Sequence, residues 1–193
     1  MSQHFFRKFK LNEILFVDLE LTCEDNQGRF VCNGNERFRE VIEIGVVKVD
    51  NVKGLIVDKE TYLITNEREP ITEFCTSLTG ISQELIDKEG VNLGKASKQI
   101  VQRFGSLNKT WFAWGCGDYN AMVKNCERKN YRNPFSCNYV NYSELYALMN
   151  GWTRSRSLKK VALANEISFN GQQHRALVDA EATAEIYLKT VRG

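Results

Sequence analysis

Apolar and β-branched residues form three strand-like runs in the first third of the chain. The first run begins at Ile14 and ends at about Leu21, and two further runs cover residues 41–49 and 55–64. The second and third runs are separated by a short polar segment that contains a glycine, as is typical of a hairpin connection. The pattern therefore predicts an antiparallel arrangement of the first three strands.

Helical spacing of apolar residues replaces the strand pattern after Pro70. Apolar side chains then recur every three or four positions, which places them on one face of a helix. This spacing predicts helices at 82–87, 93–104, 119–128, 143–149, 157–165 and 176–191, and two short apolar runs predict strands at 110–114 and 138–140. Strands that first follow one another and then alternate with helices predict an α/β fold, with a mixed sheet flanked by helices.

Composition limits the class of protein without identifying it. The chain has 193 residues, of which 42% are hydrophobic and 26% charged, and it fits a single domain spanning 1–193 with an N-terminal extension at 1–11. The net charge of +2 is too small to indicate a nucleic-acid-binding protein, although a local basic groove is compatible with it. No apolar run is long enough to span a membrane, and the N-terminal residues lack the apolar core of a signal peptide, so we expect a cytoplasmic protein. The six cysteines form no Cys-x-x-Cys pair and are expected to be free thiols.

The first predicted strand carries two carboxylates, Asp18 and Glu20, near its end. Because strand side chains alternate between faces, both project from the same face. Two neighbouring anions on a buried strand repel each other and lose their hydration, so the pair favours a cation, most simply a metal ion. The alternative is an amphipathic strand end whose carboxylates face solvent, and the pair alone does not decide between the two.

Two further aspartates are candidates to complete a metal site. Asp118 follows the strand predicted at 110–114 and begins the next helix, where a lone aspartate more often serves as the N-cap. Asp179 lies one residue before Ala180, at the edge of the apolar stripe of the last helix. A partly buried carboxylate at that position requires a partner.

His174 is one of two histidines and precedes Asp179 by five residues. Five residues of one helix turn through roughly 500°, which would leave the two side chains on different faces. The polar, glycine-containing residues before His174 instead indicate a loop. A loop histidine beside carboxylates is suited to general-base chemistry, because an imidazole can take a proton from water near neutral pH. The alternative is an ordinary surface residue.

Together, Asp18-x-Glu20, Asp118 and His174-x-x-x-x-Asp179 resemble the three exonuclease motifs of the DEDDh family of 3′→5′ exonucleases. The order of the motifs and the spacing within them both match that family. The resemblance therefore joins residues that the patterns above leave as separate candidates.

The segment 70–83, Pro-Ile-Thr-Glu-Phe-Cys-Thr-Ser-Leu-Thr-Gly-Ile-Ser-Gln, is similar to one found in the ERI-1-like branch, which includes bacterial sporulation-inhibitor homologues. The similarity extends from about residue 12 to residue 190. It implies a ribonuclease H-like fold with a five-stranded mixed sheet in the order 3-2-1-4-5. It also implies two divalent metal ions and the release of nucleoside 5′-monophosphates from a 3′ end.

The resemblance assigns a role to each candidate residue. The ligands of two Mg²⁺ or Mn²⁺ ions, hard cations that prefer carboxylate oxygen, would be Asp18, Glu20, Asp118 and Asp179. His174 would be the general base, which makes all five residues catalytic. Contacts with the terminal nucleotide would come from Leu19, Leu21, Thr79, Gly80 and Ile81. Alternatives are a place in the core for Ile81 and the N-cap of the following helix for Thr79.

Two functions from different classes follow from these observations. The first is a metal-dependent 3′→5′ exonuclease that acts on single-stranded nucleic acid with a free 3′ end, with RNA favoured over DNA. The second is a non-catalytic nucleic-acid-binding or regulatory protein on the same fold. The presence of all five catalytic positions favours the enzyme, since a purely binding role would not require them. Protein partners and oligomeric state are left open by the sequence.

Overall fold

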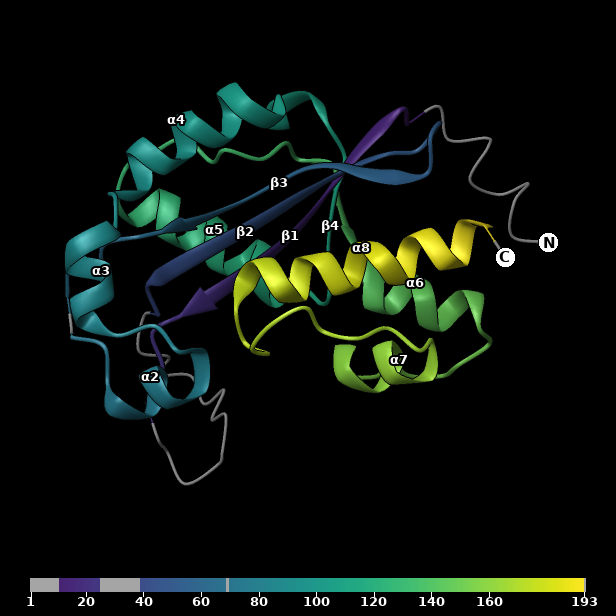
Figure 1. Ribbon diagram of the computed structural model, residues 1–193. Helices are drawn as coiled ribbons and strands as arrows, with labels where there is room; N and C mark the ends of the chain where they lie inside the picture. Colours follow the sequence, from purple (N-terminus) through teal and green to yellow (C-terminus); the bar gives the residue numbers. More distant parts are fainter. Residues whose placement is uncertain (1–10, 25–38, 69, 193) are drawn as a thin grey trace.

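The computed structural model describes residues 11–24, 39–68 and 70–192, which form a layered α/β structure (Figure 1). Within these residues the sheet has five strands, in the order β3-β2-β1-β4-β5. The strands are β1 (Glu13–Leu21), β2 (Val41–Asp50), β3 (Leu55–Leu63), β4 (Trp111–Ala113) and β5 (Tyr139–Asn141). β1, β2 and β3 pair antiparallel, whereas β4 pairs parallel with both β1 and β5. The predicted mixed sheet, its strand order and its initial antiparallel hairpin are confirmed.

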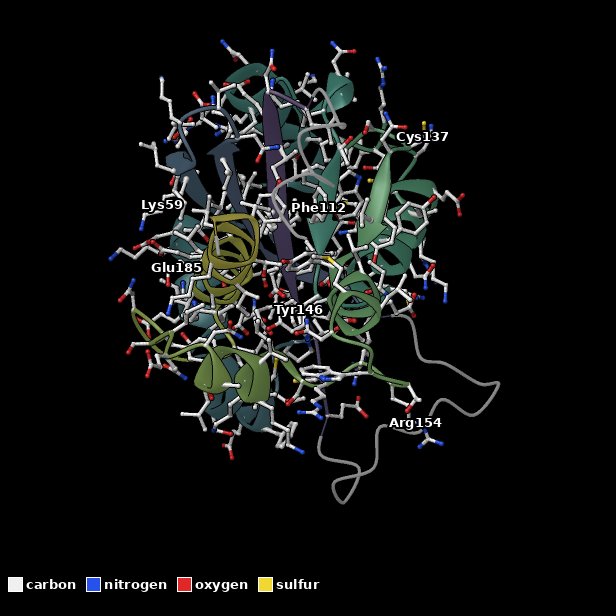
Figure 2. All side chains as sticks on the ribbon, turned by 90° about the vertical axis from the view of Figure 1, so that its right-hand side faces the viewer. Lys59, Phe112, Cys137, Tyr146, Arg154 and Glu185 are labelled. Carbon is white, nitrogen blue, oxygen red and sulfur yellow. The ribbon has the colours of Figure 1, made fainter. Side chains whose placement is uncertain are left out.

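Helices cover both faces of this sheet (Figure 1). One face carries α4 (Leu93–Phe104) and α5 (Gly117–Arg128), and the other carries α6 (Tyr142–Met149), α7 (Leu158–Ala164) and α8 (Ala176–Arg192). A 3-10 turn at Ser106–Asn108 precedes β4. Phe112 of β4 and Tyr146 of α6 belong to the aromatic core on the α8 side (Figure 2). These helices confirm the predicted ones to within two residues at each end.

The middle of β1 is buried on both faces because the strand lies between β2 and β4. Leu15 packs in the core with α4 and α5, whereas Phe16 packs in the core with α8. Since side chains alternate along a strand, Leu19 continues on the face of Leu15. Asp18 and Glu20 therefore lie on the face that α8 covers.

Two short helices, α2 (Glu73–Thr79) and α3 (Gln83–Glu89), lie at the end of the sheet where β1 finishes (Figure 1). The sequence pattern predicts α3 but not α2. α2 has only seven residues and buries only Cys75 and Thr79, so it shows no extended apolar stripe. Its ends are instead defined by local bonds, with the Thr72 side chain accepting from the Cys75 N–H and Gly80 adopting a left-handed conformation.

The helix caps show which residue caps the start of α3, a point that the sequence leaves open for Thr79. Ser82 is the N-cap of α3, and its side chain accepts from the Leu85 N–H. Thr79 is the last residue of α2, so its proposed place as the N-cap of the following helix is wrong.

Five of the six cysteines lie in the described part of the chain, and all five are free, as predicted. Cys32 lies outside the described residues. Among the helices of the described residues, none combines the length and the apolar character needed to cross a membrane.

α8 approaches the sheet closely at Gly45 of β2. A Cβ atom at this position would lie 2.3 Å from the backbone carbon of Ala176 and 2.4 Å from the Leu177 nitrogen. These are backbone atoms at the start of a helix, which cannot move aside without shifting α8 itself. Glycine at this position therefore lets α8 begin directly above β2.

Replacing Gly45 by alanine is expected to lower the free energy of unfolding by about 1–3 kcal/mol, the usual cost of overpacking. Gly117→Ala is the matched control, because no atom lies within 4 Å of a Cβ atom at Gly117. Urea unfolding of both variants measures the difference. A Gly45→Ala variant as stable as the parent would contradict the close packing described for α8.

Candidate active site

The C-terminal end of β1 places Asp18 and Glu20 beside the beginning of α8 (Figure 1). Across the sheet their partners on β2 are Gly45 and Glu43. Burial raises the pKa of Asp18, and the charge of Glu20 adds to that shift. The sequence prediction that the two share one face of β1 is confirmed.

Asp118 reaches this edge from the other side of the sheet. It lies in the first turn of α5, whose N-cap position is occupied by Cys116 without a side-chain bond. Asp118 Oδ1 instead accepts a hydrogen bond of 3.1 Å from the Leu19 backbone N–H. The N-cap alternative for Asp118 is therefore wrong, since its side chain binds β1 between the two carboxylates of that strand.

Asp179 and His174 come from the last helix and the loop before it. Asp179 lies in the first turn of α8, and His174 lies two residues before the helix, in the loop predicted from the sequence. Glu20, His174 and Asp179 each place a potential ligand atom within 4.8 Å of the others. The histidine is exposed and adopts a left-handed backbone with φ of 63°. The fold thus brings residues from β1, α5, α8 and the α8 loop to one edge of the sheet.

The pKa values of all four carboxyl groups lie above their ordinary range. Burial raises the pKa of Asp18, and the charges of Asp118 and Asp179 raise it further. Burial and the charge of Asp179 raise the pKa of Glu20 to about 8. Burial raises the pKa of Asp118 to about 7, although the hydrogen bond from the Leu19 N–H opposes this shift.

Burial also raises the pKa of Asp179, and the neighbouring His174 partly offsets the effect. Burial is the largest cause of every shift, and repulsion by neighbouring site carboxylates adds to it for Asp18, Glu20 and Asp118. Clustered carboxylate oxygens with excess negative charge are the donor set that hard divalent cations prefer. The residues present therefore fit a divalent metal site.

Two residues near this edge were not identified from the sequence. Glu43 is fully buried in β2, and its carboxylate binds the Arg175 guanidinium, with 2.6 Å between Arg175 Nη2 and Glu43 Oε1. A single glutamate inside the apolar run 41–49 was the available signal, because an unpaired buried carboxylate is costly. Its partner is 132 positions away along the chain, which local patterns cannot reveal.

The five residues expected to contact a terminal nucleotide lie close to this edge but serve structural contacts as well. Leu19 and Ile81 are buried, and Ile81 belongs to a small core cluster with Cys75. The Thr79 hydroxyl donates to the Cys75 carbonyl at 2.8 Å and accepts from the Ile81 N–H. Their contact with a nucleotide stays a prediction.

Gly80, one of the predicted nucleotide-contact residues, lies beside the loop that carries His174. A Cβ atom at Gly80 would lie 2.8 Å from the Gln172 side-chain oxygen, and the Gln172 amide donates to the Leu78 carbonyl at 3.4 Å. Leu21, the fifth predicted residue, is partly buried against the core on the α4 side. The segment 78–81 therefore touches the loop that carries His174.

Four carboxylates and a histidine at one edge of a 3-2-1-4-5 sheet are the arrangement of a DEDDh exonuclease on a ribonuclease H-like fold. The exonuclease family model matches residues 15–187, so the chain belongs to this exonuclease family. The family is dependent on divalent metal ions. The resemblance to ERI-1-like DEDDh exonucleases is confirmed.

The chain is similar in sequence to nucleases of several animals. It is 25% identical to ERI1 exoribonuclease 2 of Xenopus laevis over 90% of this chain and 27% of that protein. It is 27% identical to the 3′-5′ exonuclease Snipper of Drosophila melanogaster over 93% of this chain and 69% of that protein. The chain thus spans only about a quarter of the length of the Xenopus relative.

A solved structure shows the same fold. The nuclease domain of 3′hExo, a DEDDh family member bound to rAMP, matches with a TM-score of 0.83 at 22% sequence identity. The match covers 95% of this chain and 93% of that domain. The ribonuclease H-like architecture is therefore confirmed over nearly the whole chain.

The raised carboxyl pKa values predict that metal binding releases protons. Glu20, with a pKa of about 8, and Asp118, with a pKa of about 7, are largely protonated below those values and bind cations poorly. Affinity for Mn²⁺ is therefore expected to rise with pH and to level off above about pH 8. Calorimetric titration in two buffers of different ionisation enthalpy, at about pH 6.5, measures the protons released. An affinity independent of pH, with no proton release, would show that the metal binds elsewhere.

Proposed function

We propose that this protein is a 3′→5′ exonuclease that hydrolyses phosphodiester bonds from the 3′ end of single-stranded nucleic acid. RNA is the favoured substrate and DNA a possible one, and the products are nucleoside 5′-monophosphates. The single observation that carries the proposal is the convergence of Glu20, His174 and Asp179 within 4.8 Å at the end of β1. The names of the relatives, an exoribonuclease and a 3′-5′ exonuclease, support it.

The ligands of two Mg²⁺ or Mn²⁺ ions would be Asp18, Glu20, Asp118 and Asp179. Bound there, the cations would neutralise negative charge that develops on the phosphoryl group and on the leaving oxygen. Burial of the carboxylates supports this assignment, because an ionised group that has lost its water gains most from a cation. The rAMP bound in the 3′hExo structure supports a nucleoside monophosphate as a ligand of this chain.

His174 would act as the general base. Its exposure and its place beside Glu20 and Asp179 allow the imidazole to approach a water molecule at the carboxylate edge. One ring nitrogen takes a proton from the water as the water oxygen bonds to phosphorus. The bond from phosphorus to the 3′ oxygen of the preceding nucleotide breaks, and that oxygen keeps the electron pair and takes a proton from solvent.

A non-catalytic nucleic-acid-binding protein is the second candidate. Binding alone would not require four carboxylates that repel both one another and the phosphates of nucleic acid. The upward pKa shifts at this edge indicate a cost that a metal-dependent reaction explains. The enzyme is therefore the better supported of the two.

The first test follows cleavage of matched RNA and DNA strands that carry a label at either the 5′ or the 3′ end. With Mn²⁺, strands labelled at the 5′ end should shorten stepwise, and strands labelled at the 3′ end should release a labelled mononucleotide first. Addition of EDTA should abolish both reactions, because the carboxylates alone do not neutralise the phosphoryl charge. Degradation from the 5′ end, or full activity in EDTA, would overturn the proposal.

A second test separates the base from the metal ligands. His174→Ala should slow cleavage by roughly 10²–10⁴-fold, the usual contribution of a positioned general base, with Mn²⁺ affinity nearly unchanged. Asp179→Ala should lose both cleavage and metal affinity. Single-turnover rates and calorimetric titration of both variants measure the two effects. If His174→Ala weakens metal binding as much as Asp179→Ala does, His174 is not the general base.

A further inference from the structure

Glu43 lies beside the carboxylate site, and both of its side-chain oxygens accept hydrogen bonds from other groups of the protein. Its side chain is fully buried and lies opposite Glu20 in the β1–β2 register. Oε1 accepts from Arg175 Nη2 at 2.6 Å and from the Thr61 hydroxyl at 3.1 Å, and Oε2 accepts from the Ala176 N–H at 2.8 Å. Arg175 Nε lies 3.1 and 3.2 Å from the two oxygens. Glu43 is thus a structural anion and not a free ligand for a cation.

The bond from Ala176 gives Glu43 a specific effect on α8. Ala176 is the first residue of the helix, and N–H groups at a helix start have no partner within the helix. A carboxylate next to these groups also interacts favourably with the helix dipole. Glu43 therefore caps α8 from the neighbouring strand and fixes where the helix begins above Gly45.

Arg175 links Glu43 to the neighbouring His174. Its guanidinium forms a two-pronged bond with Glu43, so both the backbone of residue 176 and the side chain of residue 175 are fixed to β2. His174 precedes this anchored pair and holds a left-handed φ of 63°, a conformation that persists only where the surroundings impose it. Asp179 follows it in the first turn of the helix.

We propose that Glu43 and Arg175 form a positioning pair that aims His174 at the carboxylate edge while fixing the first turn of α8. This inference rests on the proposed exonuclease function. Neither residue touches the substrate in this account, since the Glu43 carboxylate is enclosed by its own partners. Their effect on cleavage is transmitted through the backbone on either side of Arg175.

The test compares Arg175→Gln with Arg103→Gln. Arg103 of α4 also makes a bidentate ion pair with a strand, 2.8 Å from Asp58 of β3, but lies on the helix layer opposite α8 and in a more exposed setting. Arg175→Gln is expected to lower kcat by about 10–100-fold, the cost of a displacement near 1 Å in a catalytic group. KM and Mn²⁺ affinity should stay within about threefold of the parent values, because Glu43 still accepts from the Ala176 N–H and so keeps the first turn of α8, with Asp179, in place. Arg103→Gln should leave kcat unchanged.

A double-mutant cycle tests whether the two residues act as a unit. If they do, Glu43→Gln combined with Arg175→Gln should cost no more in kcat than the worse single variant. Additive losses would overturn the pairing. Urea unfolding is measured for every variant, and Arg175→Gln, whose side chain is partly exposed, still tests the proposal if Glu43→Gln does not fold.

NMR gives a readout that does not depend on activity. At fixed pH, the ring resonances of His174, assigned by their loss in His174→Ala, should shift and broaden in Arg175→Gln but not in Arg103→Gln. Unchanged His174 resonances, an unchanged kcat, or losses of kcat and Mn²⁺ affinity of equal size would each overturn the positioning role. A parent protein without nuclease activity would contradict the proposed function, while the resonances would still test the contact.

Discussion

Four half-buried carboxylates that lose water and gather negative charge at one edge of the sheet are the constraint on which the arrangement of this molecule depends. Their pKa values all lie above the ordinary range because burial removes water and because neighbouring carboxylates add negative charge. The fold lessens this cost with partial positive charge. Asp118 and Asp179 lie in the first turns of α5 and α8, where the helix dipole favours anions, and Asp118 also accepts from the Leu19 N–H. These contacts do not balance all the negative charge of the four carboxylates, and divalent cations can neutralise the rest.

The central position of β1 explains how these helix ends meet. Because β1 lies between β2 and β4, the end of one strand is within reach of helices on both faces of the sheet. On the α8 face, Gly45 removes the side chain that would hold the helix away, and Glu43 binds the first N–H of the helix. The contacts that fix α8 to β2 thus also fix the distance between Glu20 and Asp179. Fold stability and site geometry depend on the same two positions of β2.

Periodicity predicted most of the fold but not the contacts that complete the site. The helix expected at 93–104 has those bounds in the structure, because its apolar stripe packs directly on the sheet. α2 escaped prediction because its seven residues are defined by the Thr72 and Gly80 caps and not by a stripe. The motif residues were recognisable from their spacing. The Asp118 bond to Leu19 and the Glu43 bond to Arg175 join positions 99 and 132 residues apart, so only the folded chain reveals them.

The carboxylate edge is expected to hold divalent cations next to a 3′-terminal nucleotide. A crystal structure of the protein with Mn²⁺ and a nucleoside 5′-monophosphate, analysed by anomalous scattering of manganese, tests it most directly. Two manganese peaks are expected, bound by oxygens of Asp18, Glu20, Asp118 and Asp179, with the nucleotide phosphate beside them and His174 facing it. Manganese bound away from these carboxylates, or a nucleotide bound at this edge without any metal peak, would contradict this expectation.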